Sequence, residues 1–450
     1  MKSRILLFTL IILSHQVYSA EIRDLSIINI NGIGANKVLK IKESAHVDWW
    51  IEMGDKMLIA NNHSDLDYLP QSVTLVKTLK NINIENLAYQ TLGHCDHSGL
   101  DEILHSQLDV VYMNNSSQII DISNFENKKQ VFGHDSIEKF EKNRVLSYQL
   151  KNKTDTNSFS ADINTQNLVD SVSADRWFSQ VEYLSSLDRM EEADLVIAGE
   201  WLESKFNDLG LVTSRVSLHN NYRGFNVLGF KQGTTRPDDW YVVGAHMDSR
   251  NRFWDDLQPS PGAEDNASGC SGVLEVANVI SHYDTEASIV FLCFIEEESG
   301  LLGSKDVVTY LTNEGDIDKV KTMLNMDMIS YRLGDRNVAI AGTNTSNYQS
   351  LAETVAANGN LYSEIDWQIN LGMCCTDFLS FSNANIPAVT SNQPDISTYF
   401  GYHRTTDLAE NLDPVLGSGI VKANLATLID LVGVDFDSLD LIFSHGFESD

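Results

Sequence analysis

The stretch WYVVGAHMDSRNRFWDDLQPSPGAEDNASG, Trp240–Gly269, decides the fold of this chain. Its first part, Tyr241–Ala245, is a short, β-branched apolar run of the kind that forms a buried strand. His246 and Asp248 follow that strand directly, and a polar loop then leads to Asp265 before an apolar-periodic helix. Open α/β sheets bind ligands at the carboxyl ends of their strands, so this stretch predicts such a sheet with a metal site at that edge.

Strand and helix patterns alternate around this stretch in the second half of the chain. Helical spacing occurs at Ala174–Leu187, Ala193–Leu209, Gly269–Ser281, Gly303–Thr312, Tyr348–Ala357 and Gly417–Val432. Strand patterns occur at Phe225–Phe230, Trp240–Ala245, Ala287–Ile295, Val320–Met326, Val338–Ala341 and Ile386–Thr390. This alternation predicts an α/β fold with a mixed, mostly parallel sheet flanked by helices.

The first half of the chain has a different pattern. Residues 21–150 contain short strand patterns separated by turns, which predict a β-rich amino-terminal domain, either a removable prosegment or a permanent module. The expected strands are Leu25–Ile30, Lys37–Ile41, Lys56–Ala60, Val73–Leu79, Val110–Met113 and Gln118–Ile122. Residues 151–167 are poor in apolar residues and rich in Asn, Thr and Ser, so we expect a linker there and a catalytic domain over 168–450.

The first twenty residues have the pattern of a secretory signal peptide. Lys2 and Arg4 precede the apolar run Ile5–Leu13, and small residues lead to Ala20. The apolar run is too short for a membrane span, and no other stretch reaches about eighteen apolar residues. We therefore expect a secreted or periplasmic protein without a membrane span, with an uncleaved anchor as the alternative.

The charge balance of the chain limits its partners. Its 63 acidic residues against 32 basic ones give a formal charge of −31, which argues against a nucleic-acid partner. Hydrophobic residues make up 42% of the chain, which indicates a globular protein. We expect this protein to be a monomer. The cysteine count of five is odd, so at least one is free or pairs elsewhere. The neighbours Cys374 and Cys375 allow a vicinal disulfide, two thiols or a bond to another cysteine.

Polar side chains follow three further predicted strands, each at the point where the strand ends. Glu297 and Glu298 come after Ala287–Ile295, Asp327 follows the strand ending at Met326, and His403 lies in the loop after the last strand. Histidines and carboxylates without a cysteine cluster suit catalytic Zn²⁺, and these are too many ligands for one ion. They suit two zinc ions that share a carboxylate and activate one water.

Other interpretations of these residues are weaker. Any one of them alone is more often a turn or capping residue. Glu296 and Glu264, next to the candidate ligands, are interpreted as a surface residue and a bystander. No Gly-x-Ser-x-Gly motif occurs, which argues against a serine hydrolase. His94-Cys95-Asp96-His97 lacks a second ligand pair, so a structural role is favoured there.

Five sequence blocks resemble one family in their order: GAHMDSR, PGAEDNASG, EEESGLLGS, NMDM and YHRTTD. Over about Ser171–Val434 the chain is similar to the bacterial leucyl aminopeptidase family of dizinc exopeptidases, whose relatives include glutaminyl cyclases and glutamate carboxypeptidases. The resemblance implies two zinc ions, with these residues as ligands: His246 and Asp327 for one ion, Glu298 and His403 for the other, and Asp265 between both. It also implies Glu297 as general base and acid, Asp248 as the acceptor that orients His246, and Asp407 as a support for the His403 loop.

The chain departs from the family beside the expected substrate pocket. Leu371 stands where the family has the first cysteine of a Cys-x₃-Cys disulfide, and Met373 stands where some members have a tyrosine. Methionine donates no hydrogen bond, so either Tyr399 or Tyr402 substitutes, or the metals act alone. An apolar pocket is expected from these residues, each of which could equally pack the core: Met328, Met373, Phe378, Tyr399, Phe400 and Tyr402.

Together these features predict a secreted metallo-aminopeptidase. Its expected substrates are the amino termini of peptides or proteins, with Leu or another apolar residue in first position. Glutaminyl cyclase or carboxypeptidase activity on the same scaffold, and a catalytically silent binding module, are the alternatives.

Overall fold

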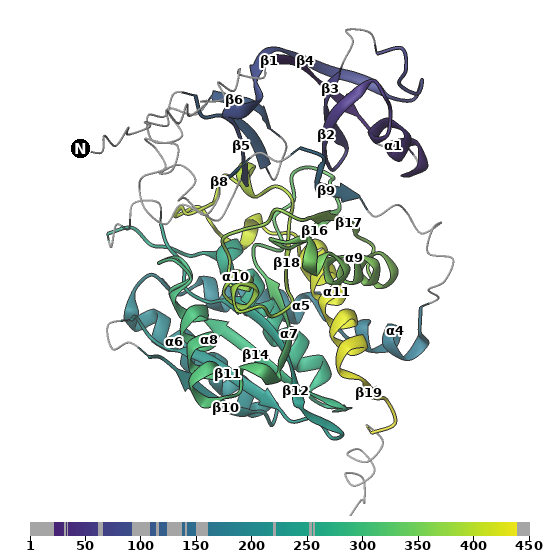
Figure 1. The fold of residues 1–450 in the computed structure, drawn as a ribbon. Coiled ribbons are helices and arrows are strands. Elements are labelled where there is room, and N and C mark those ends of the chain that lie inside the picture. Colours follow the sequence, from purple (N-terminus) through teal and green to yellow (C-terminus); the bar gives the residue numbers. More distant parts are fainter. Residues whose placement is uncertain are drawn as a thin grey trace, which may run out of the picture.

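A sheet of 13 strands runs through the whole structure (Figure 1). The computed structural model describes residues 22–30, 33, 35–61, 66–91, 109–113, 117–123, 137–139, 142–149, 161–218, 222–251, 254 and 257–438. The predicted signal peptide and the cluster at 94–97 lie outside these residues. The strands follow the order β10-β11-β14-β12-β15-β18-β16-β17-β9-β2-β3-β1-β4, so strands from both halves of the chain share one sheet.

The catalytic half contributes the first eight strands of that order. They are β10 (Val212–Val216), β11 (Asn226–Lys231), β14 (Ala287–Phe294), β12 (Arg236–His246), β15 (Val320–Met326), β18 (Ala388–Asn392), β16 (Val338–Gly342) and β17 (Asp366–Asn370). The adjacent strands β14, β12, β15 and β18 are parallel, whereas β11 is antiparallel to β14 and β16 to β18. The predicted mixed, mostly parallel sheet is confirmed for this half, and a short pair, β13 (Asp284–Thr285) and β19 (Val434–Asp435), lies apart from it.

Helices cover both faces of this sheet. They are α4 (Ile163–Val169), α5 (Ala174–Ser185), α6 (Glu192–Asp208), α7 (Ser268–Ile280), α8 (Leu302–Glu314), α9 (Gln349–Tyr362), α10 (Phe378–Asn383) and α11 (Pro414–Val432). Successive residues of a strand point to opposite faces. In β14, Phe291 therefore packs into the core of α5, α6, α7, α9 and α11, while Leu292 packs into the core of α8 and α10. Burial on both faces explains the unbroken apolar sequence of this strand.

Helix α11 is long and apolar enough to cross a membrane by length and composition alone. Most of its apolar window is buried inside the protein, between α7 and α9, which is typical of a core helix. Its first turn is capped by Asp413, whose carboxylate accepts the backbone N–H of Val415 and Leu416.

The amino-terminal half is β-rich, as predicted, but the sequence analysis missed one helix and four of its strands. Its elements are β1 (Ile22–Asn29), α1 (Ala35–Lys42), β2 (Val47–Met53), β3 (Lys56–Asn61), β4 (Thr74–Asn83), β5 (Leu87–Thr91), β6 (Asp109–Met113), β7 (Ser117–Asp121), β8 (Ile137–Lys139) and β9 (Arg144–Gln149). The strand predicted at Lys37–Ile41 is wrong, because this segment is part of helix α1. Val38 and Ile41, three residues apart, are buried together while Leu39 is exposed, which is the spacing of a helix.

The two halves are joined through a strand pair rather than only through a linker. Strand β9 is antiparallel to β17 and parallel to β2, so it carries the catalytic sheet into the amino-terminal domain. Residues 151–160 of the predicted linker lie outside the described residues. The last part of the predicted linker is wrong, because residues 163–167 are helical. They belong to helix α4, which Asp162 caps.

Candidate metal centre

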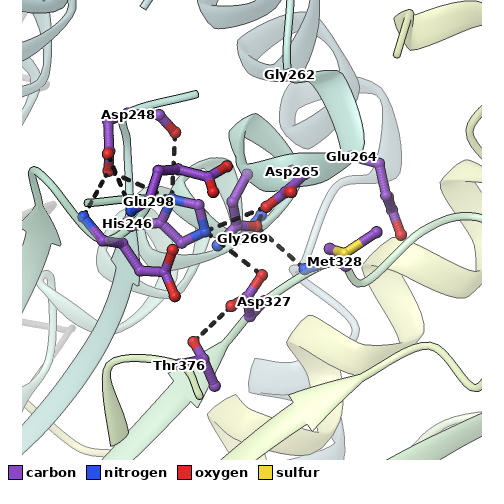
Figure 2. Close-up of polar contacts among 12 residues, drawn as sticks. His246, Asp248, Gly262, Glu264, Asp265, Gly269, Glu298, Asp327, Met328 and Thr376 are labelled. Carbon is purple, nitrogen blue, oxygen red and sulfur yellow. Dashed lines mark hydrogen bonds and ion pairs between the residues drawn. The ribbon is translucent and has the colours of Figure 1, made fainter. Parts of the chain in front are cut away.

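The candidate ligands lie where parallel strands end, as the sequence predicts. His246 is the last residue of β12, Asp327 directly follows β15, and Glu297 and Glu298 lie three and four residues beyond the end of β14. Because β14, β12 and β15 are adjacent and parallel, these side chains meet at one edge of the sheet (Figure 2).

Two groups of side chains could each hold a metal ion. The first is His246, Glu297 and Asp327, and the second is Asp265, Glu298 and His403. Within each group the ligand atoms lie within 4.8 Å of one another, and all six residues are buried. The structure therefore brings together every residue that the resemblance implies as a ligand, together with the implied base Glu297.

Asp265 lies between the two groups. Its Oδ1 is 3.3 Å from Nε2 of His246, and its Oδ2 is 3.0 Å from Nε2 of His403. The residue lies in a kinked turn, Ala263–Ala267, that precedes α7; Asp265 and Asn266 have non-helical backbone angles there, and the peptide bond between them is cis. The Asn266 carboxamide ties this turn to the strand end of Asp327, because Nδ2 donates to Met326 O and Oδ1 accepts from Met328 N. Sequence reasoning gave Asn266 no role.

Asp248 lies behind the first group, on the Nδ1 side of His246. Its Oδ1 is 3.4 Å from that nitrogen, and its main-chain oxygen is 3.2 Å from the same atom. The carboxylate also accepts the backbone N–H groups of Glu297 and Glu298 at 3.2 and 3.3 Å. One buried carboxylate thus fixes the imidazole and the loop that carries both glutamates.

The contacts of Asp407 differ from the expectation. Its carboxylate accepts the N–H groups of Glu264 and Asp265 at 2.8 and 3.0 Å, and it accepts the hydroxyl of Tyr399 at 2.6 Å. Asp407 therefore supports the Asp265 turn through these bonds, not only its own loop around His403. Burial raises the pKa of Asp407 to about 6, although its hydrogen bonds favour the charged form and lower the pKa.

Two glutamates that sequence reasoning set aside are buried. Glu264 accepts the N–H groups of Ser330 and Tyr331, so it holds the segment that follows Asp327 and is not a bystander. Glu296 is not a surface residue, because it is buried against Arg223, whose Nε lies 2.9 Å from its Oε1. In both cases the loops that supply the partner are remote in sequence, so local pattern gave no signal.

The site residues fit a bound cation. Nε2 of His246 and Oε1 of Glu297 are buried and have no hydrogen-bond partner in the described part of the chain. Burial raises the pKa of Glu297 well above its usual value, and the carboxylates of Glu298 and Asp327 add to that effect. Buried carboxylates at this density are costly unless a positive charge faces them. Histidine nitrogen and carboxylate oxygen are the ligands that zinc takes at catalytic sites.

Arg250 supplies one such charge, at the second group. Its Nε lies 2.9 Å from Oε2 of Glu298, and its Nη2 lies 2.6 Å from Nδ1 of His403.

The predicted pocket residues divide between two places. Met328, Tyr399 and Tyr402 form one small cluster with Tyr331 and Ile396 beside the metal ligands. Met373 and Phe378 instead pack into the core of α8 and α10, and Phe400 is half exposed. For Met373 and Phe378 the pocket prediction is therefore replaced by a core role.

The question about Cys374 and Cys375 is answered by the structure, which pairs them in a vicinal disulfide. The next residue, Thr376, donates its hydroxyl to Oδ2 of Asp327. The loop that departs from the family thus contacts a candidate ligand. Cys270 and Cys293 are buried thiols, and Cys95 lies outside the described residues.

Arg189 braces the loops on both sides of the site and was missed by sequence reasoning. Its buried guanidinium donates to the carbonyls of Met247 at 2.7 Å, Pro261 at 2.8 Å and Gly262 at 2.7 Å. Met247 lies between His246 and Asp248, and the other two carbonyls precede the Asp265 turn.

Replacing Arg189 with Met is expected to lower the free energy of unfolding by about 3–5 kcal/mol, because it leaves several buried carbonyls without a donor. Urea denaturation of the metal-free protein measures this change. The matched control is Arg215→Met, which removes an exposed ion pair with Glu203 and should cost less than about 1 kcal/mol. Equal costs for the two variants would contradict a bracing role for Arg189.

Comparison with known proteins agrees with this fold. Residues 226–427 match the family model described as peptidase family M28. A probable zinc metalloprotease of Pyrenophora teres f. teres is 34% identical over 149 residues, which are 29% of this chain and 32% of that protein. Leucine aminopeptidase 1 of Paracoccidioides brasiliensis is 30% identical over 183 residues, 38% of this chain and 46% of that one. The match thus spans less than half the length of either relative.

A solved structure extends the likeness of the fold. The LapA aminopeptidase of Legionella pneumophila aligns with a TM-score of 0.56 over 77% of this chain and 98% of that chain, at 19% identity. The fold is therefore similar to that of a solved aminopeptidase. The segment 226–427 belongs to peptidase family M28.

Proposed function

We propose that this protein is an aminopeptidase that uses two zinc ions. The observation that carries the proposal is the position of Asp265, whose two oxygens face histidines of two separate ligand groups. A carboxylate in that position can bridge two ions. Bound zinc would lower the pKa of a water molecule and polarise the scissile carbonyl.

The residues of the chain would bind the two ions and transfer the proton. His246 and Asp327 would hold one ion, Glu298 and His403 the other, and Asp265 both. Glu297 takes the proton of the attacking water and passes it to the leaving amine. Its buried position, which raises its pKa well above the usual value, suits a group that must bind and release a proton.

The contacts of the two candidate tyrosines distinguish them as substitutes for the family's tyrosine. The hydroxyl of Tyr399 donates to Asp407, and burial raises the pKa of Tyr399. Tyr402 stacks on the imidazole of His403 with ring centroids 3.8 Å apart. The hydroxyl of Tyr399 is thus engaged by Asp407, whereas the ring of Tyr402 lies against a candidate ligand.

An apolar first residue of the substrate is supported by the cluster of Met328, Tyr399 and Tyr402 beside the ligands. Burying a Leu or Met side chain there would contribute about 1.5–3 kcal/mol. We further propose that the protein acts outside the cytoplasm as a monomer, on the basis of the signal-like first twenty residues and the acidic composition.

A metal count combined with a substrate panel tests the proposal. We expect two zinc ions per chain and hydrolysis of leucyl and methionyl p-nitroanilides. We expect no hydrolysis of acetyl-leucyl p-nitroanilide, because its amine is blocked. Cyclisation of amino-terminal glutamine, or release of carboxyl-terminal residues in place of amino-terminal ones, would assign the site to a different activity. Absence of all three activities in a zinc-loaded protein would indicate a binding module.

A further inference from the structure

The guanidinium of Arg250 lies inside the second ligand group. Its side chain is almost completely buried, and it contacts two of the three ligands, Glu298 at 2.9 Å and His403 at 2.6 Å. A second contact with His403, from Nε of Arg250 to Nε2 of the ring, measures 3.4 Å. A permanent positive charge therefore lies among the groups that would bind the second ion.

The contacts between Arg250 and His403 engage both nitrogens of the imidazole. Arginine has only donors, so Nη2 faces Nδ1 and Nε faces Nε2 as donors. Nε2 also lies 3.0 Å from Oδ2 of Asp265 and 3.2 Å from Oε2 of Glu298. A metal ion binds the lone pair of this same nitrogen. The Arg250 donor and a metal ion would therefore compete for the same position at Nε2.

His246 in the first group has the opposite arrangement. Its Nδ1 faces two acceptors of Asp248, the main-chain oxygen at 3.2 Å and Oδ1 at 3.4 Å. The proton of the neutral ring is then on Nδ1, and the lone pair on Nε2 points toward Asp265 and Asp327. The first group is arranged to receive a metal ion, whereas the second must first be rearranged.

We propose that Arg250 acts as an internal cation that competes with the second metal ion for Glu298 and His403. The first group then fills before the second, and the second ion binds more weakly because it must displace a paired guanidinium. This inference rests on the proposed two-metal site and assigns it an order of filling. Arg250 is in this sense a positioning residue for the metal centre.

Trp254 is the residue that the side chain of Arg250 would contact after its displacement by a metal ion. The Cζ atom of Arg250 lies 5.5 Å from the centroid of the Trp254 ring, within the range of a cation–π contact. Trp254 is 38% exposed, and Arg223 lies over the same ring at 5.4 Å. A swing toward this ring would take the charge of Arg250 out of the ligand group while the side chain keeps an aromatic contact.

The test is a calorimetric titration of the metal-free protein with Zn²⁺, repeated with Co²⁺, whose visible absorption reports each ligand group. We expect two steps in the unmodified protein. In Arg250→Met the second step should tighten by about tenfold to a hundredfold while the first stays unchanged. Arg250→Gln also removes the charge, so its second step should tighten by a similar factor. This variant replaces Arg250→Met in the test if the Met variant does not fold.

The matched control is Arg223→Met, which removes the neighbouring, partly buried arginine over the same tryptophan. It should leave both steps unchanged, because Arg223 pairs with Glu296 outside both ligand groups. A second step that is unchanged or weaker in both Arg250 variants would overturn the inference.

The same titration separates this inference from the proposed function. One ion in the unmodified protein and two in Arg250→Met would contradict the two-zinc proposal and support the competition. Two ions of equal affinity in every variant would support two zinc ions and contradict the competition.

Discussion

Replacing Glu297 with Gln is expected to lower kcat by about 10²–10⁴-fold while the protein keeps its zinc. Glutamine has a similar shape but cannot take a proton from water. The metal count is essential, because Glu297 lies close enough to His246 and Asp327 to be a ligand itself. Loss of zinc together with activity would make Glu297 a ligand, and a nearly normal rate would remove it from the mechanism.

The neighbouring Glu296→Gln is the matched control. It changes a buried carboxylate in the same loop, but one that pairs with Arg223 and lies outside both ligand groups. We expect a loss of stability from the broken ion pair, with kcat per folded molecule within a few fold of the unmodified protein. If Glu296→Gln loses as much activity as Glu297→Gln, disturbance of the loop explains both results.

Replacing Asp265 with Ala is expected to weaken metal binding in both groups by more than about a hundredfold, because one residue faces both histidines. Activity measured without added zinc should fall below detection. Elemental analysis after gel filtration gives the zinc content. If one ion remains at full affinity, Asp265 serves a single group and the bridged arrangement is wrong.

Glu264→Gln, one residue earlier, controls for damage to the kinked turn Ala263–Ala267. Glu264 is buried and accepts from Ser330 and Tyr331, and burial raises its pKa well above the usual value. Glutamine keeps an acceptor for these N–H groups. We expect this variant to bind zinc normally, in contrast to Asp265→Ala.

The catalytic sheet could be predicted because its signals are local and strong. The run Ala287–Phe294 is apolar throughout, and α7 follows a turn sequence with clear helical spacing. The error at Lys37–Ile41 arose because five residues are too few to separate a period of 2 from a period of 3.6.

The candidate ligands could be predicted because each lies in a short motif next to a strand end. Their supports could not, because these depend on which remote loops face each other. Asp407 accepts from the turn of Asp265, and Arg189 reaches carbonyls about sixty and seventy residues away along the chain. Met373 and Phe378 were left open between a pocket and a core position for a related reason. An apolar side chain near a ligand in sequence can point to either face of its loop, and only packing decides which.

The strand pair between β9 and β17 has a consequence for any maturation of the chain by proteolysis. Gln149, Tyr148 and Ser147 pair with Gln368, Ile369 and Asn370, and Leu146 O accepts from Leu371 N at 2.7 Å. The side chain of Leu146 is buried in the core of the amino-terminal domain. A cut between Gln149 and Ile163 would break no bond of this sheet. The two fragments would separate on a denaturing gel and still migrate together as one particle under native conditions.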